Sequence, residues 1–546
     1  MVTVTLRQML LRHLTFLPVF VLALPAAETA ESVQKTVNRY CFGCHNNQLK
    51  SGDVSLAGLK PRGDGPEAAV WEKVLRKVKT AEMPPPSAPK PSAETRAAVS
   101  EWLEAELDRA GRAKPDPGAP LIHRLNRAEY TNAVRDLLGL DLDHGATLPV
   151  DDSGYGFDNI GEVLTVSPLL LEKYLSTARR VARLAVGTVK PQPVLEKYSA
   201  NRGPDALSPD ELPLSIRGGM AFRRYFPLDA EYVLTVRMRG SPDSSIPQPK
   251  LDLRIDGVRA KLFEVAISDL EEQQYTRNYE LRLPLKAGMH QIAAGVLVEG
   301  LQTETGIPNR GRGFVPAPMP TPISVDYVTV GGPYQVSGAG DTESRRRIFL
   351  CRPAAGQPED PCARRILSTL ARRAYRRPAA AADVDPLMAI FTRGRQDGKS
   401  FDAGIEAALR ALLVSPSFLF RVERAPQGTL AGATYRISDL ELASRLSFFL
   451  WSSIPDDELV NLAAAGKLRA ALPQQVKRML SDARSKALVD NFAGQWLHLR
   501  NISGWKPDPD KYNQFDEDLR RAMQQETELF FDYVIRQDRS VLDFIN

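Results

Sequence analysis

Residues 40–48 read YCFGCHNNQ, in which two cysteines are separated by two residues and the second is followed directly by a histidine. This is the attachment pattern of a c-type haem: thioether bonds would join the porphyrin to Cys41 and Cys44, and His45 would supply one axial nitrogen to the iron. A redox-active CxxC or half of a zinc site is the alternative, but the sequence lacks the βαβ context of the first and the second CxxC of the other. The stretch therefore predicts one covalent haem c in a small, all-α, class I-like cytochrome c domain over residues 31–110.

A six-coordinate electron carrier needs a second axial ligand, and the sequence offers Met83. This residue precedes three prolines in KTAEMPPPSAPKPS (79–92), and proline fixes the backbone of such a loop. A thioether sulfur also suits ferrous iron. We expect Met83 to bind the iron, with a surface methionine as the alternative, and we expect a closing helix over 92–107 with Ser92 or Thr95 as its N-cap.

The first thirty residues have the pattern of a Sec-type signal peptide. Arg7 and Arg12 precede an apolar stretch over 14–24, and small residues follow it. The cleavage site is not a clean match, so an uncleaved anchor is the alternative. Because no other run is long enough to cross a bilayer, we expect a periplasmic or exported protein with no transmembrane span in the mature chain.

Cys351 and Cys362 are the remaining two cysteines of the four in the chain. In an oxidising compartment their spacing of eleven positions favours a local disulfide, with two reduced, buried thiols as the alternative. The 71 basic and 66 acidic residues give a formal charge of +5 and are interspersed, so no nucleic-acid partner is expected.

Turn-rich and amphipathic segments follow the haem motif. Residues 111–120 (GRAKPDPGAP) are predicted to be a linker, and residues 121–195 a helical domain. Within that domain we expect helices over 121–140 and over 167–186, the second capped by Ser167. The oxygen-rich stretch PVDDSGYGFDNIG (149–161) lacks EF-hand spacing, which favours a structured turn over a calcium site.

Residues 205–335 change to a period of two and predict a jelly-roll-like β-sandwich. The dipeptide Asp256–Gly257 ends one alternating run and predicts a hairpin turn. Strand aromatics are candidates for a carbohydrate-binding platform, although a core position is the more common role of such side chains; they are Tyr225, Phe226, Tyr232 and Tyr279.

Residues 345–425 and 435–546 return to helical periodicity and predict two further helical domains. Trp451, Trp496 and Trp505 are predicted to be core anchors. No nucleophile elbow, P-loop or dinucleotide fingerprint occurs in the sequence, so no catalytic residue is assigned. The expected fold class is multidomain α+β: a cytochrome c domain, helical segments, an inserted sandwich and a C-terminal helical region.

Four stretches resemble a family of large exported, cytochrome-c-containing proteins abundant in planctomycetes and related bacteria. They are LIHRLNRAEYTNAVRDLLGL, DDSGYGFDNIGEVLTVSPLLLEKYL, CARRILSTLARRAYRRP and DLELASRLSFFLWSSIPDDELVNLA. The resemblance implies the domains of unknown function 1587, 1595 and 1592, and haem c attachment at Cys41, Cys44, His45 and Met83. Pairing of Cys351 with Cys362 also fits the family. Relatives look longer than this chain, which implies that the domain at 435–546 is truncated at its C-terminus.

We expect an exported protein that transfers electrons through a single haem. Its partner would be a periplasmic redox protein, and its large body would bind that partner or a polysaccharide. Two alternatives remain open at this point. One is a haem-dependent oxidoreductase of the peroxidase or oxidase type, and the other is a carbohydrate-binding scaffold with a structural haem.

Overall fold

The chain divides into two compact units in a mixed α+β fold with antiparallel sheets. The first unit is Met1–Ala119 with Gly428–Tyr435, and the second is Pro120–Gln427 with Arg436–Asn546. The computed structural model describes residues 29–115, 117–118, 122–190, 192–200, 212–213, 216–240, 249–265, 275–297, 323–430, 433–508, 510–512 and 515–545. All but the last two residues of the predicted signal peptide lie outside these ranges. Among the described helices, none is long and apolar enough to cross a membrane.

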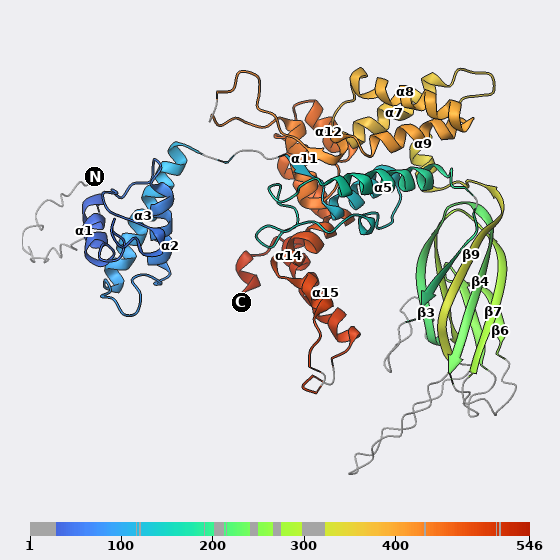
Figure 1. The fold of residues 1–546 in the computed structure, drawn as a ribbon, viewed down its shortest axis with the longest axis horizontal. Coiled ribbons are helices and arrows are strands. Elements are labelled where there is room, and N and C mark those ends of the chain that lie inside the picture. Colours follow the sequence, from blue (N-terminus) through green and yellow to red (C-terminus); the bar gives the residue numbers. More distant parts are fainter. Residues whose placement is uncertain are drawn as a thin grey trace, which may run out of the picture. The chain divides into compact units, whose positions relative to one another are not determined.

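The first unit is helical, as Figure 1 shows in blue. Its elements are α1 (Ala30–Tyr40), η1 (Ser51–Asp53), α2 (Ala68–Lys79) and α3 (Ala93–Ala113). Ser92 is the N-cap of α3 and accepts a hydrogen bond of 3.1 Å from the backbone N–H of Thr95. The predicted N-cap is thus confirmed, but α3 continues three residues into the stretch predicted to be linker. The cost of Gly111 to the helix, about 1 kcal/mol relative to alanine, is not enough to end it there. The core of the unit comprises Val33, Val37, Leu56, Trp71, Val99 and Leu103.

The second unit begins with a short strand rather than with the predicted helix. Strand β1 (His123–Arg124) pairs antiparallel with β10 (Phe420–Arg421), and α4 (Arg127–Leu138) follows it. The helix starts late because Asn126 and Glu129 form a capping box. The Asn126 side chain accepts from the N–H of Glu129 at 2.9 Å, and the Glu129 carboxylate accepts from the N–H of Asn126 at 3.0 Å. The prediction of a helix from residue 121 is therefore wrong for residues 122–126, and residue 121 lies outside the described residues.

Helix α5 (Pro168–Val186) matches its prediction, since the Ser167 hydroxyl accepts from the N–H of Leu170 at 3.2 Å. It is connected to α4 through η2 (Gly145–Thr147). The helix ends at Gly187, whose φ of +79° is the left-handed conformation that glycine favours. A Cβ atom on Gly187 would lie 2.6 Å from that of Ala339, so the chain before the sandwich and the chain after it touch at this point.

The β-region, drawn in green to yellow in Figure 1, forms two four-stranded antiparallel sheets. Their strand orders are β2-β9-β4-β7 and β3-β8-β5-β6. The strands are β2 (Val194–Ser199), β3 (Ile216–Phe226), β4 (Asp229–Gly240), β5 (Lys250–Ile255), β6 (Val258–Glu264), β7 (Tyr275–Leu285), β8 (Gly288–Leu297) and β9 (Ser324–Gly338). Side chains of both sheets share one core. Asp256 and Gly257 have φ of +50° and +78° between β5 and β6, which confirms the predicted hairpin.

Two of the four strand aromatics are core residues of the sandwich, which is the more common role expected for them, and are not part of a carbohydrate-binding platform. Phe226 and Tyr232 are fully buried and pack edge to face at 4.7 Å between ring centroids. Tyr225 packs against the helical core of this unit, and Tyr279 packs against the core of the sandwich. Alternation places strand aromatics on the inner face, where burial of their large apolar area is most favourable.

Helices resume after the sandwich and build the rest of the unit. The first group is α6 (Glu343–Ile348), α7 (Asp360–Ala374), α8 (Ala381–Gly398), α9 (Phe401–Leu412) and α10 (Pro416–Leu419). The second group is α11 (Asp439–Trp451), α12 (Asp457–Ala464), α13 (Leu472–Ser481), η3 (Ala483–Ser485), η4 (Leu488–Ala493), α14 (Gly494–Trp496), η5 (Leu499–Gly504), α15 (Glu517–Arg536) and η6 (Val541–Phe544). Helices α4, α5, α7, α8 and α9 contribute to one continuous core.

One of the three predicted tryptophan anchors is a core residue. Trp451 is fully buried, and its indole N–H donates to the carbonyl of Met479 at 2.9 Å. Trp496 and Trp505 are 48% and 50% exposed, so the prediction is wrong for them. Each nevertheless packs against other aromatic rings, for example Trp505 against Phe515 at 5.5 Å between ring centroids.

Cys351 and Cys362 form a disulfide that joins the segment after α6 to the first turn of α7. Closure of a loop of this length restricts the unfolded chain and is worth about 3 kcal/mol. We therefore expect replacement of both cysteines by serine to lower the free energy of unfolding by about that amount in urea titrations followed by circular dichroism. A reductant that leaves thioethers intact should destabilise the wild type equally and leave the double variant unchanged. Equal stability of wild type and variant would contradict this role.

His144 makes stability depend on pH. Its side chain is only 3% exposed, and burial, aided by the nearby Arg180 charge, lowers the pKa of His144 to about 4. In the unfolded chain the pKa of histidine is about 6.5. As pH falls from 6.5 towards 4, the unfolded state therefore binds a proton that the folded state does not, and stability is lost by up to about 3 kcal/mol.

We expect His144→Gln to remove this part of the acid sensitivity. The measurement is the free energy of unfolding at about pH 7 and about pH 4.5 for both proteins. The loss between the two pH values should be about 2–3 kcal/mol smaller in the variant, because carboxylates contribute equally to both proteins. An identical loss would show that His144 titrates normally in the folded protein.

Candidate functional site

The end of α1 positions the cysteine–histidine motif. Cys41 is the C-cap of this helix, and its N–H donates to the carbonyl of Val37 at 2.8 Å. The backbone N–H of His45 then donates to the carbonyl of Cys41 at 3.0 Å. This tight turn keeps Cys41, Cys44 and His45 on one side of the chain.

The ring of His45 is oriented by the backbone that folds back over the motif. Its Nδ1 lies 3.3 Å from the carbonyl oxygen of Val54, and the N–H of Leu56 donates to the carbonyl of His45 at 2.8 Å. In the tautomer that donates from Nδ1 to this carbonyl, Nε2 carries a free lone pair. A carbonyl on the far nitrogen is the usual arrangement for a histidine that binds a metal through the other.

Met83 lies in the loop between α2 and α3, and its side chain lies near the cysteine–histidine motif. Its N–H donates to the carbonyl of Lys77 at 3.1 Å, and the preceding Glu82 accepts from the Thr80 hydroxyl at 2.9 Å and pairs with Lys77. The side chain is 38% exposed. The loop is therefore tied to the last turn of α2 immediately before the first of its prolines.

A single cavity of about 470 Å³ brings the four predicted residues together. Cys41, Cys44, His45 and Met83 all line it, and most of the remaining lining is apolar: Val54, Leu56, Val70, Val74, Val78, Pro84, Pro85 and Ala88. Apolar walls with a few convergent ligating atoms are what a large planar cofactor requires. The residues present thus fit a covalent haem c.

The two thiols do not have the environment of a redox-active pair. Cys41 and Cys44 are not joined to each other, and burial raises the pKa of the Cys41 thiol, with the neighbouring Cys44 adding to the effect. Redox-active CxxC motifs instead lower the pKa of the attacking thiol, because the thiolate is the reactive species. This environment argues against the redox alternative.

Asn46 is a structural residue of this site that sequence reasoning missed. Its amide group donates to the carbonyls of Phe42 and Gly43 at 3.1 and 3.2 Å, and its amide oxygen accepts from the N–H groups of Gln48 and Leu49 at 2.9 and 3.0 Å. Asparagine is a frequent anchor of turns for this reason. That preference, at the position directly after the histidine, was the available signal.

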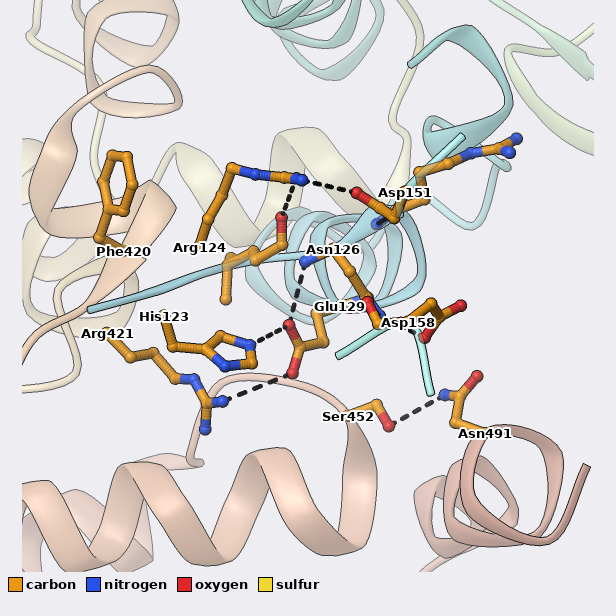
Figure 2. A network of polar contacts seen from close by, with 12 residues as sticks. His123, Arg124, Asn126, Glu129, Asp151, Asp158, Phe420, Arg421, Ser452 and Asn491 are labelled. Carbon is orange, nitrogen blue, oxygen red and sulfur yellow. Dashed lines mark hydrogen bonds and ion pairs between the residues drawn. The ribbon is translucent and has the colours of Figure 1, made fainter. Parts of the chain in front are cut away.

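A second candidate lies in the other unit, where Figure 2 shows a network of polar side chains around Glu129. The carboxylate of Glu129 accepts from the N–H of Asn126, lies 3.0 Å from His123 Nε2, and lies 3.8 Å from a guanidinium nitrogen of Arg421. Burial acts to raise the pKa of Glu129, but attraction to Arg421 and the hydrogen bond with His123 outweigh it and lower the pKa. The carboxylate is therefore ionised although it is only 3% exposed.

Two aspartates of the stretch 149–161 extend this network. Asp151 accepts from Arg124 at 2.8 Å, and Asp158 accepts from the Asn126 side chain at 2.8 Å and from Arg500 at 2.7 Å. The stretch is thus a structured turn, held by arginine and amide partners. In Figure 2 these side chains converge from elements that are far apart in the sequence.

Three family models match separate segments of the second unit, as the resemblance implied. The model for domain of unknown function 1587 matches residues 123–187, that for 1595 matches residues 362–423, and that for 1592 matches residues 437–546. Each is described as a protein of unknown function. The network around Glu129 joins the three segments, because Glu129 is in the first, Arg421 is in the second and Arg500 is in the third.

No protein of curated function matches this chain significantly. Among solved structures, 28% of the chain is similar to 91% of a family 35 carbohydrate binding module from an environmental isolate, at 11% identity and a TM-score of 0.16. A second module of that family, from Clostridium thermocellum, is matched over 26% of this chain and 97% of that one, at 14% identity and a TM-score of 0.15. The chain also spans 13% of dimeric latent PorU from Porphyromonas gingivalis, with 9% identity and a TM-score of 0.18 over 27% of its own length. Likenesses at these TM-scores carry no functional information.

Proposed function

We propose that this chain is an exported c-type cytochrome protein that transfers single electrons through one covalent haem c. The observation that carries the proposal is the convergence of Cys41, Cys44, His45 and Met83 on one apolar cavity. When bound, the haem would supply an iron that alternates between its ferric and ferrous states. Everything else required of the site is done by residues of this chain.

Each residue has a distinct task in this proposal. Cys41 and Cys44 would hold the porphyrin through thioether bonds, and His45, whose Nδ1 lies beside the Val54 carbonyl, would bind the iron through Nε2. Met83 would supply a second ligand, a thioether sulfur that favours the ferrous state. The apolar part of the lining would contact the faces of the porphyrin ring.

Met83 also distinguishes this proposal from its alternatives. A peroxidase or oxidase needs an open position on iron, and a methionine bound there would block a substrate. In a scaffold with a structural haem, loss of Met83 would leave function unaffected. Met83 lines the same cavity as His45, and this placement favours a closed, six-coordinate iron.

The disulfide and the N-terminal residues support a cellular compartment and a class of partner for this chain. The Cys351–Cys362 disulfide fits an oxidising environment, which supports export to the periplasm together with the pattern of the N-terminal residues. We therefore propose a periplasmic redox protein as the partner. A polysaccharide partner was expected from strand aromatics, and burial of Phe226 and Tyr232 removes much of that support.

We expect Met83→Ala to convert a low-spin ferric haem into a high-spin one. Loss of the sulfur ligand removes the weak far-red absorption band of methionine-ligated haem and lowers the reduction potential, because a soft ligand to ferrous iron is lost. Absorption spectra of the oxidised and reduced full-length protein, together with a redox titration, provide the measurement.

Two further variants make this test specific. Met523→Ala removes a methionine that is exposed to a similar degree on α15, and it should leave the spectrum unchanged. Met83→His should restore the low-spin state without the far-red band, at a potential below that of the wild type. A wild-type protein that is already high-spin would refute the electron-carrier proposal and favour the oxidoreductase alternative.

A further inference from the structure

A second cavity, of about 640 Å³, lies next to β10 in the helical part of the second unit. Its walls come from residues 416–424, from α11 and from the chain around Arg376. Five arginines line this cavity against two glutamates: Arg376, Arg377, Arg421, Arg424 and Arg445, against Glu423 and Glu441. An excess of positive charge in a concave site attracts anions unless acidic groups of the protein neutralise it.

Two of the five guanidinium groups are fully engaged with acidic partners. Arg377 forms two hydrogen bonds with Asp383, at 2.7 and 2.8 Å, and Arg445 forms two with Glu423, both at 2.5 Å. Arg376 instead donates to four backbone carbonyls, those of Ala374, Ser417, Phe418 and Phe420. Arg376 is therefore satisfied in hydrogen bonds but has no carboxylate of its own.

The acid that remains, Glu441, is also occupied. Its carboxylate accepts from the N–H of Arg424 at 2.9 Å and from the N–H of Ser438 at 2.7 Å, where it forms a capping box for α11. It therefore binds the backbone of Arg424. The side chain of Arg424 is exposed and forms no ion pair within the described residues.

Two polar atoms at the cavity are buried and have no hydrogen-bond partner among the described residues. They are Nε of Arg421 and the hydroxyl oxygen of Ser444. The Arg421 guanidinium lies over the Phe448 ring at 4.7 Å and lies 3.8 Å from Glu129, too far for a hydrogen bond. A buried donor left unpaired costs about 1–3 kcal/mol, so a ligand that satisfies these atoms gains that energy.

The charges around Glu129, which lies beside this cavity, also indicate an excess of positive charge. Burial and the neighbouring charge of Arg421 lower the pKa of Arg376 to about 9, while Glu129 acts in the opposite direction. Arginine stays protonated at neutral pH in spite of this. Two guanidinium groups thus share one buried carboxylate, and positive charge is left in excess at the floor of the cavity.

We propose that this cavity binds a small organic carboxylate through Arg421 and Arg424, with the Ser444 hydroxyl as a further contact. The planar fork of a guanidinium matches a carboxylate in two-point hydrogen bonding. The same walls also carry apolar side chains, those of Ile122, Phe420, Val422 and Leu440. They would contact the carbon skeleton of an organic ligand, and inorganic phosphate and sulfate have no such skeleton. The site is independent of the haem cavity and of the proposed electron transfer.

Isothermal titration calorimetry on the full-length, haem-containing protein tests the proposal, with succinate and glucuronate as probes and inorganic phosphate as the competing class. We expect at least one of the two carboxylates to bind, and phosphate to bind at least about tenfold more weakly. Arg424→Ala should weaken carboxylate binding about tenfold or more, because a charge-assisted hydrogen bond is lost.

Two variants separate the site from general effects. Ser444→Ala removes an unpaired hydroxyl, so it should leave folding stability unchanged or slightly raised and yet weaken binding. Arg393→Ala removes an exposed arginine on α8, which is not part of the cavity, and should leave binding unchanged. Absence of binding by either carboxylate, equal binding by all variants, or phosphate binding as tight as that of the carboxylates would each overturn the proposal.

Discussion

The second unit depends on one buried charge, the carboxylate of Glu129. An ionised carboxylate removed from water is strongly unfavourable unless partners surround it, and removal of one partner of such a buried pair costs about 3–5 kcal/mol. Glu129 obtains its partners from three places: the backbone at the start of α4, His123 on β1 and Arg421 on β10. The requirement to satisfy it therefore fixes where α4 begins and holds the two short strands together, although nearly three hundred residues of sequence separate them.

The first unit is organised around an apolar cavity instead of a charge. Its core contains few fully buried side chains, and a domain of this size buries too little apolar surface to be very stable by itself. A cofactor that fills the cavity would complete this core, under our proposal, by contact with the apolar side chains that line it. Cofactor attachment and folding of this unit would then reinforce each other, as ligand binding to the native state does in general.

The sequence was most informative where a short pattern carries its own geometry. The Asp256–Gly257 turn and the Ser167–Pro168 cap could be predicted because a local chemical constraint defines each of them. CxxCH at 41–45 and the Met-Pro loop at 83 are patterns of the same kind, and the haem site that they predict stays a prediction. The start of α4 could not be predicted in this way. Leucine, isoleucine and arginine at 121–125 suit a helix, but the capping box at Asn126 makes the helix begin after it. Pairing with β10 is a tertiary effect that no local window contains.

Tertiary contacts also decided which aromatics are buried. Trp496 and Trp505 have the same local periodicity as the buried Trp451, but the side chains packed around them leave each about half exposed. The partner of the His45 ring could not be predicted, because a backbone carbonyl supplies that contact. The arginine-lined cavity at β10 depends on which ion pairs form, and composition alone does not indicate that.

The contact between Gly187 and Ala339 has a consequence for how the second unit is built. The chain leaves the helical body and returns to it at neighbouring points, so the sandwich is an insertion whose two ends meet. Helices before and after it share one continuous core, and helix α5 packs against α9 across the junction. The helical body therefore encloses an inserted domain at residues 187–339, and exchange of that domain would disturb the packing of the body where the sandwich contacts it, as Tyr225 does against the helical core.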